Sequence, residues 1–494
     1  MKLAELKKRI SIPILIVLLW LAVCLFFVFF ISYADNARKL EPNGIMLYTI
    51  EDIQRYYIAK CAPVNPSFFL MPWTKPMWAI IGSAFIAFMG ALGISGITSL
   101  RILIPFFSAG TLYATYKLMK KIELSDNFSA LVLVLIASNP IYFYLSISAY
   151  NETMLTFFII FAIYFFYAGK YRLSSLFVSL APLVRFEGGI LAIIWFLYFA
   201  YKKKFTNLVI LIIPTLIYAA ANYVFFGSFS QMISYYERIV WYQIHYWGLD
   251  VTDIEYLQSI FGPLLVCYGG YVFIFLTALG IFGRRGNKKL YMILLVLLSF
   301  FLYHILNFFV FYKTLQTRWF LPVFLLSCIF AASGLVTIAG KVKKYNFGRM
   351  LAAALFITVL FSSLGVISGG LPEGPTFSPH ERHLFPVETI KWLDRYIDEK
   401  KPNNVYVSFE IVGLYLADDN CSLAKKNLLS GPAPYAIRYN KSFYTDNRWN
   451  VIEDKPPSDG ILIMQIMEGN LTGYIPWAEV IKEFPEDNIR VYRI

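Results

Sequence analysis

The stretch ISIPILIVLLWLAVCLFFVFFIS, at residues 10–32, carries no charged side chain and follows the basic cluster Lys7, Lys8 and Arg9. A helix of this length rises about 35 Å, enough to cross a hydrocarbon core roughly 30 Å thick. The run is too long for a signal-peptide core, and no small-residue cleavage site follows it. It therefore predicts an uncleaved first membrane span whose N-terminal side faces the cytoplasm.

The rest of the chain has the same apolar character. Of its 494 residues, 58% are hydrophobic and 15% are charged, and the mean hydropathy is +0.59. Soluble domains are about 25% charged, so this composition excludes a soluble enzyme. Further apolar blocks lie at about residues 77–98, 100–116, 128–146, 152–168, 173–184, 188–201, 206–226, 261–283, 290–312, 319–340 and 350–368. We expect an all-α polytopic membrane protein with about 11 transmembrane helices.

The positions of the basic residues predict the topology. The net charge of +13 is carried by short clusters between apolar blocks, without a basic face interleaved with aromatics, so it indicates the positive-inside rule and not nucleic-acid binding. The clusters expected in the cytoplasm lie at 117–121, 170–172, 202–204, 284–289 and 341–349. An even number of crossings must separate any two of them. Block 77–98 is therefore expected to lie at the outer interface or re-enter the membrane, and Arg185, Glu187 and Gly188 are expected to split 173–201 into two short helices.

This topology predicts two parts. Residues 1–369 form the membrane domain, whose outer loop covers 33–99, and residues 370–494 form a small extracytoplasmic α/β domain. The tail contains a helical pattern, VETIKWLDRYIDEK, followed by the strand-like segments NNVYVSF, GILIMQI and NIRVYRI. Of the five cysteines, Cys61 and Cys421 are the pair that could meet outside the membrane.

The first outer loop carries the residues that suggest chemistry. It contains EDIQRYYIAK at 51–60 and PWTKPMW at 72–78, so acids and a lysine lie near an apolar interface. Transporter sites lie near the midplane on broken helices, whereas this loop favours chemistry at the membrane surface. His380 and His383 have a metal-like spacing without a third ligand. We predict no metal site and leave a divalent cation open as a cofactor.

At these residues the chain resembles the GT-C superfamily, integral membrane glycosyltransferases that use polyprenyl-phosphate sugars, including dolichyl-phosphate mannose, as donors. Glu51-Asp52 followed by Tyr56 looks like the family's acidic motif, Lys75-Pro76 like its Lys-Pro, and Arg101 like the arginine that opens a span. Three further stretches are similar to family motifs: SNPIYFYLSISAYNETMLTFF (138–158), SLFVSLAPLVRFEGGIL (175–191) and TRWFLPVF (317–324). The resemblance covers most of residues 1–370, in order. This sequence departs from the family pattern in two places. Its acid pair reads Glu-Asp where many members have Asp-Glu, and Ser and Val partly replace the family's usual small residues before Arg185.

The resemblance implies roles for these residues. An inverting transfer needs a carboxylate to take the proton of the acceptor hydroxyl, and we expect Asp52 first and Glu51 second in this role. Asp52 could instead cap the helix that follows it. The lipid phosphate needs cations, and the candidates at predicted outer ends of spans are Lys75, Arg318, Arg101 and Arg185, which could equally be interfacial residues. Lys75 and Arg318 are the first choices.

Two residues are left with alternatives. Glu152 begins a span without a basic neighbour in sequence, so it predicts an acceptor contact, an arginine partner or a favourable interaction with the helix dipole. Tyr56 is expected either to contact the acceptor substrate or to have a structural role.

The expected activity is that of a hexosyltransferase moving a sugar, with mannose as one candidate, from a polyprenyl-phosphate donor to a glycan, lipid or protein acceptor. Transfer is expected on the outer or luminal face of a prokaryotic cell membrane or of the endoplasmic reticulum membrane. The alternative is a non-catalytic transporter or flippase of lipid-linked saccharides, which would explain the spans but not the acidic loop. An oligosaccharyltransferase ranks lower because the sequence lacks WWDYG.

Overall fold

The computed structural model describes residues 11–32, 50–70, 75–94, 97–226, 268–283, 287–307 and 317–341, and in the tail residues 392, 396, 399, 405–407, 461–465, 479–484 and 489–493. The helices are α2 (Ile12–Ser32), α3 (Ile50–Cys61), η2 (Pro66–Leu70), α4 (Pro76–Ala91), α5 (Ile97–Lys121), α6 (Asp126–Ala137), α7 (Pro140–Ile147), α8 (Asn151–Tyr167), α9 (Tyr171–Val184), α10 (Gly188–Tyr201), α11 (Phe205–Phe226), α14 (Gly270–Gly283), η3 (Lys288–Leu290), α15 (Tyr291–Asn307), η5 (Thr317–Phe320) and α16 (Leu321–Lys341).

Within these residues the helices have the lengths and composition of a membrane protein. Five are long and apolar enough to cross a bilayer, namely α2, α5, α11, α15 with η3, and α16 with the end of η5. The bent pair α6 and α7 makes a sixth candidate, and α4, α8, α9, α10 and α14 are shorter apolar helices. The predicted blocks 261–283 and 290–312 lie partly outside the described residues and 350–368 lies wholly outside them, so the count of about 11 spans stays a prediction.

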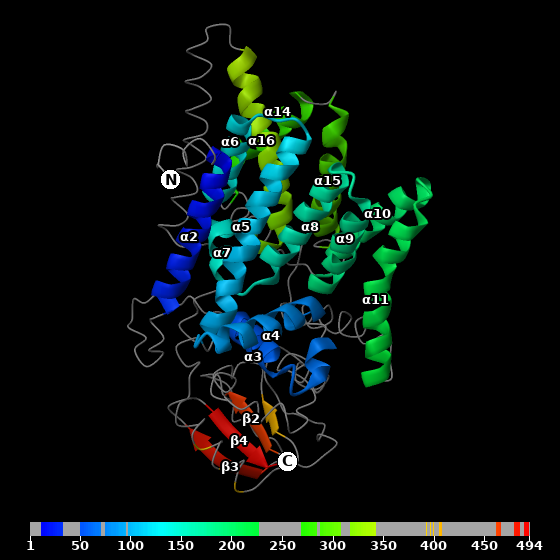
Figure 1. Ribbon diagram of the computed structural model, residues 1–494. Coiled ribbons are helices and arrows are strands. Elements are labelled where there is room, and N and C mark those ends of the chain that lie inside the picture. The colour runs from blue at the N-terminus through cyan, green and yellow to red at the C-terminus, as the bar shows by residue number, and fades with distance from the viewer. Residues whose placement is uncertain are drawn as a thin grey trace. The chain divides into compact units, whose positions relative to one another are not determined.

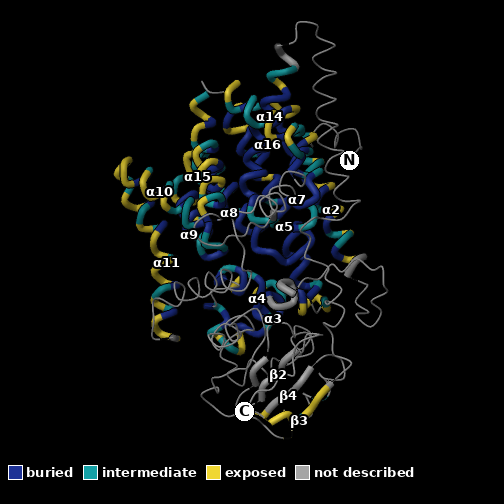
Figure 2. The backbone as a smooth tube through the Cα atoms, turned by 180° about the vertical axis from the view of Figure 1, so that it is seen from behind, coloured by how far each residue is buried: buried dark blue, intermediate teal, exposed yellow. Residues whose placement is uncertain are grey.

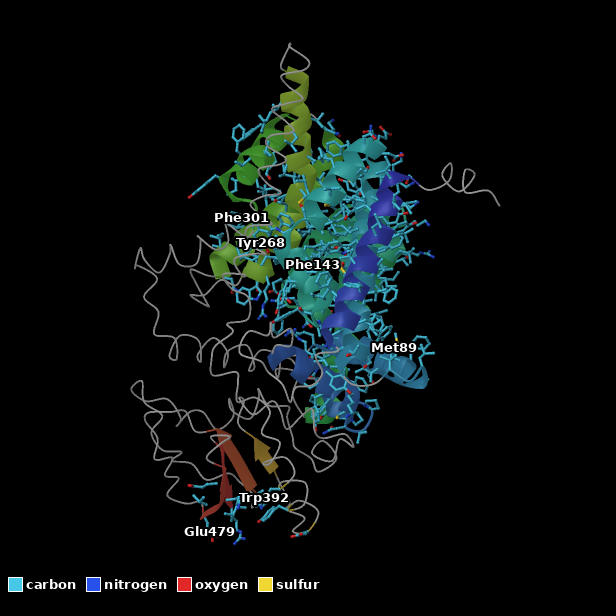
Figure 3. The ribbon with its side chains drawn as sticks, turned by 90° about the vertical axis from the view of Figure 1, so that its left-hand side faces the viewer. Met89, Phe143, Tyr268, Phe301, Trp392 and Glu479 are labelled. Atoms are coloured by element: carbon cyan, nitrogen blue, oxygen red, sulfur yellow. The ribbon has the colours of Figure 1, made fainter. Side chains whose placement is uncertain are left out.

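The chain forms two compact units. The first contains residues 1–31, 101–217 and 250–374, and the second contains residues 32–100, 218–249 and 375–494. In the first unit α14 packs along α16, α8 along α9, and α9 against α10 (Figure 1). Tyr268, labelled in Figure 3, lies with its ring 4.9 Å from that of Phe324 on α16. Figure 2 shows the buried positions of this unit gathered on α5, α8 and α16.

Glycines set the spacing between α14 and α16. A Cβ added at Gly280 would lie 1.8 Å from the carbonyl oxygen of Phe330, and one at Gly334 would lie 2.2 Å from that of Leu276. Each helix therefore presents a glycine to the backbone of the other. Small residues allow this close approach between helices in membranes, where it maximises van der Waals contact.

The predicted break after 173–184 is confirmed. The helix α9 ends at Val184 and α10 begins at Gly188, so Arg185, Phe186 and Glu187 form the turn between them. A Cβ at Gly188 would lie 2.3 Å from the backbone carbon of Ala181, so only glycine lets the start of α10 lie this close to α9. Both helices have 14 residues, about 21 Å each, which is short of a full crossing.

The apolar block predicted at 128–146 forms two helices, α6 and α7. The chain bends by 71° between α6 and α7. Asn139 caps α7 by accepting a hydrogen bond of 2.9 Å from the backbone N–H of Tyr142, and Pro140 occupies the first turn, where it has no N–H to lose. Ser-Asn-Pro is thus a combined stop and start signal inside an apolar block.

The second unit contains α3, η2 and α4 as well as the tail strands. The helix α3 packs against α4 and η2, and a Cβ at Gly82 of α4 would lie 3.0 Å from the Cβ of Ala59. With 16 residues, α4 is shorter than the predicted block 77–98 and ends before α5 begins. Cys61 takes part in a disulfide bond whose partner lies outside the described residues.

The tail contains a four-stranded sheet in the order β1-β2-β4-β3, with β1 (Val405–Val407), β2 (Ile461–Gln465), β3 (Glu479–Phe484) and β4 (Ile489–Arg493). The pair β1 and β2 is parallel, and β4 runs antiparallel to both β2 and β3. Three of the strands fall in the segments predicted from sequence. Trp392 and Tyr396 are helical and stack at 4.7 Å, within the predicted helix. The domain boundary at residue 369 lies outside the described residues.

Candidate functional site

Four charged side chains from four helix ends meet in the first unit. Glu152 is the second residue of α8, Arg185 follows α9, Glu187 precedes α10, and Arg318 lies in η5 just before α16. We call these four residues the arginine–glutamate cluster. A helix begins or ends at each of these four positions. The four side chains therefore meet at helix ends, where backbone polar groups are exposed, and not along the sides of helices.

Arg185 is the centre of this cluster. Its Nη1 lies 2.6 Å from Glu152 Oε1, its Nη2 lies 2.7 Å from Glu187 Oε1, and its Nε lies 3.2 Å from both oxygens of Glu187. The guanidinium thus binds one carboxylate at its tip and a second along its edge. Of the three alternatives for Glu152, an arginine partner is the one that these contacts support. Its place at the start of α8 also favours a negative charge.

Arg318 approaches the same carboxylate from a second direction. Its Nε lies 3.4 Å from Glu152 Oε1, and its guanidinium carbon lies 4.3 Å from the centre of the Tyr150 ring. A cation over an aromatic face gains electrostatic energy, more so when it is shielded from water. Two guanidinium groups and two carboxylates give the cluster a formal charge of zero. The second oxygen of Glu152, Oε2, is buried and has no hydrogen-bond partner among the described residues.

Arg101 supports the turn that leads into this cluster. It is fully buried, and its Nε donates a hydrogen bond of 2.9 Å to the carbonyl oxygen of Ile147, the last residue of α7. A cation at a helix C-terminus satisfies a terminal carbonyl and interacts well with the helix dipole. Thr153 ties the start of α8 to α7 through a 2.6 Å hydrogen bond to Leu145. These contacts favour a structural role for Arg101.

His304 belongs beside the cluster but is absent from the sequence-based candidates. It lies on α15 with 1% of its surface exposed, its ring is stacked on Trp319 at 6.5 Å, and Phe320 is 4.8 Å away. Neither ring nitrogen has a hydrogen-bond partner of good geometry among the described residues, although the backbone of Trp319 lies beside the ring. A single histidine in an apolar run gives no periodic signal, so sequence reasoning has little means to find it.

The loop candidates belong to the second unit. Glu51 and Asp52 lie in the first turn of α3, and their side chains lie outside the described residues. Tyr56 on the same helix is 5% exposed. Lys75 is 6% exposed and precedes Pro76 with φ of 68° and ψ of 141°, a conformation that costs an ordinary residue about 1–3 kcal/mol.

The opposite ends of the first-unit helices carry the basic residues. The hydroxyl of Tyr167, the last residue of α8, donates a hydrogen bond to the carbonyl oxygen of Lys289, and Lys289 Nζ lies 2.6 Å from Glu123 in the turn between α5 and α6. Lys170 and Lys202 follow the corresponding ends of α8 and α10. The helices α8, α10 and α15 therefore have a lysine-rich end and an end that carries the cluster or His304.

The described residues contain no group of three His, Cys, Asp or Glu side chains close enough to hold a metal ion. His380 and His383 lie outside the described part of the chain.

No family model matches the chain, and no curated protein matches it. It is similar to the crystal structure of the oligosaccharyltransferase of Archaeoglobus fulgidus in complex with Zn and sulfate, at 15% sequence identity and a TM-score of 0.44. The match covers 80% of this chain and 61% of that one.

Proposed function

We propose that the protein is a membrane glycosyltransferase that moves a sugar from a polyprenyl-phosphate donor to an acceptor on the outer or luminal face of the membrane. The observation that carries this proposal is the arginine–glutamate cluster. It joins Glu152, Arg185 and Arg318, which come from the three stretches 138–158, 175–191 and 317–324 that resemble GT-C motifs. Segments far apart in sequence thus meet at one site, as they do where residues of a binding site converge.

The roles follow from charge and position. Asp52 is our candidate for the base that takes the acceptor proton, with Glu51 as the second choice. Lys75 and Arg318 are the candidates for the donor phosphate. The strained backbone of Lys75 supports this role, because such strain is frequent at binding sites. Arg185 already binds two carboxylates, so we assign it to positioning Glu152 and Glu187 rather than to the phosphate.

Two observations support an extracytoplasmic site. The lysine-rich helix ends described above are those expected in the cytoplasm, so the cluster lies at the other membrane face. Cys61 in the first loop is disulfide-bonded, which is typical of an oxidising compartment outside the cytoplasm.

The topology predicts which cysteines an impermeant reagent can label on intact cells. Val64→Cys, in the first loop, is expected to be labelled from outside, as are cysteines placed at 363–371. Lys203→Cys, in the exposed turn between α10 and α11, is expected to be labelled only after permeabilisation. Both positions are exposed, so the pair controls for reactivity. Labelling of Lys203→Cys on intact cells would overturn the topology and the placement of the cluster.

The donor site predicts a kinetic signature for the two cations. A charge-assisted hydrogen bond contributes about 1.5–3 kcal/mol, so Lys75→Ala or Arg318→Ala should weaken donor use roughly 10- to 150-fold. Arg318→Lys keeps the charge without the planar group and should recover only part of this loss. The measurement is transfer rate against donor concentration at saturating acceptor. A change in acceptor dependence with unchanged donor dependence would remove both residues from the phosphate site.

A further inference from the structure

We propose that Glu152 and His304 form a hydroxyl-binding subsite, in which Glu152 Oε2 and the imidazole of His304 hydrogen-bond hydroxyl groups of a saccharide. The inference rests on the proposed function and specifies which part of the substrate this end of the bundle recognises.

Two buried polar groups at this end have atoms without a well-formed hydrogen bond. Glu152 and His304 are each 1% exposed, and neither Glu152 Oε2 nor a ring nitrogen of His304 has such a bond within the described residues. Buried polar groups are almost always hydrogen-bonded, because leaving one unpaired costs the free energy of its lost hydration. Both residues interact with the same arginine, Arg185, so their open atoms indicate that a ligand or water completes their hydrogen bonds.

Glu152 and His304 both interact with Arg185. Glu152 is bonded to Arg185 at 2.6 Å, and Arg185 is bonded to Glu187 at 2.7 Å. His304 interacts electrostatically with both Arg185 and Glu187. Its ring also packs on Trp319 and Phe320, the two residues that follow Arg318 in the chain.

The unpaired atoms limit the chemistry of the ligand. A carboxylate oxygen only accepts hydrogen bonds, so Glu152 Oε2 needs a donor, and a phosphate, which offers acceptors, cannot supply one. Arg185 already binds two carboxylates, so a phosphate at Glu152 Oε2 would meet a carboxylate and not a free cation. A hydroxyl group donates and accepts, so it satisfies either group. A saccharide presents several hydroxyls at fixed spacing, which suits two fixed polar groups.

The apolar surroundings of His304 indicate that its ring nitrogens have a role other than packing. Phe300, one turn earlier on α15, is fully buried, and the ring neighbours of His304 are aromatic. A phenylalanine would fill this position without burying a polar group. Packing alone therefore does not explain a histidine here.

The test replaces His304 with Phe and measures both stability and ligand preference. Purified protein in nanodiscs is titrated with short-chain polyprenyl phosphates that carry mannose, glucose, galactose or N-acetylglucosamine, and with the same lipid phosphate without a sugar. We expect His304→Phe to raise the unfolding temperature by about 2–5 °C, because the unpaired imidazole is removed. The wild-type preference for the best sugar-bearing lipid should fall roughly 3- to 10-fold, with binding of the sugarless lipid unchanged.

Two further variants sharpen the result. His304→Asn retains a donor and an acceptor and should keep part of the preference. Tyr271→Phe removes one hydroxyl from an exposed residue of α14 and should change neither quantity.

The outcomes separate the two proposals. If the wild type prefers a sugar-bearing lipid and His304→Phe keeps that preference, the subsite is wrong and the glycosyltransferase proposal stands. An unchanged or lower unfolding temperature in His304→Phe also overturns the subsite, because the imidazole then has a partner in the protein. If the wild type prefers none of the sugar-bearing lipids, the proposed donor class itself is wrong.

Discussion

Replacing Asp52 with Asn is expected to lower the rate of sugar transfer by about 10²- to 10⁴-fold, the usual contribution of a positioned general base. Asn has nearly the size of Asp and retains much of its hydrogen bonding, but it cannot take the proton of the acceptor hydroxyl. The folded protein and the affinity for the donor should be preserved, because Asp52 has no part in binding the lipid phosphate. Single-turnover transfer with saturating donor and acceptor measures the effect.

Glu51→Gln is the matched control, one residue earlier in the same turn of α3. Its transfer rate should stay within a few-fold of the wild type. A dead Glu51→Gln together with an active Asp52→Asn would exchange the roles of the two acids. Near-normal transfer in both variants would contradict a catalytic carboxylate in this loop.

Replacing Arg185 with Leu should cause the largest loss of stability in the first unit. The change leaves Glu152 and Glu187, both buried, without the guanidinium that binds them, and among the described residues Arg318 at 3.4 Å is then the remaining cation at Glu152. Removing one partner of a buried ion pair costs about 3–5 kcal/mol. Unfolding of the purified protein, followed by heat or by denaturing detergent, measures the shift in midpoint.

The control for this variant is Arg172→Leu, an exposed arginine near the start of the same helix, α9. It should change the free energy of unfolding by less than about 0.5 kcal/mol. The double variant Arg185→Leu with Glu187→Leu should be more stable than Arg185→Leu alone, because it also removes one unpaired carboxylate. Equal midpoints for Arg185→Leu and the wild type would contradict the ion pairs described here.

Much of the helical fold follows from the sequence. The break between α9 and α10 is predictable because a charged pair and two glycines interrupt an apolar run too long for one span. The tail strands β1, β2 and β4 are predictable from short β-branched and apolar runs. Strand β3, EVIKEF, is not predictable in this way, because its acidic residues and lysine interrupt the alternation of apolar and polar side chains. A shift in pairing between Val480 and Lys482 disrupts that alternation further. The 71° bend at Asn139 escapes it because the flanking residues are apolar on both sides.

The candidate site is predictable as a set of residues but not as a set of contacts. Sequence order marks Glu152, Arg185 and Arg318 one by one, whereas their pairing depends on helices that meet only in the folded bundle. The saturation of Arg185 by two carboxylates could not be foreseen, since Glu152 is 33 residues away from it. His304 could not be found because its place beside the cluster depends on how α15 packs.

The paired glycines of α14 and α16 constrain how this bundle can move. The backbones of α14 and α16 are in contact at Gly280 and Gly334, so neither helix can turn about its axis or slide without a collision, and the two are expected to move as one rigid pair. Arg318 and Trp319 lie immediately before α16, at one end of this pair. Any motion that admits a substrate to the cluster is then expected in the shorter α9 and α10, which are joined by the three-residue turn that contains Arg185.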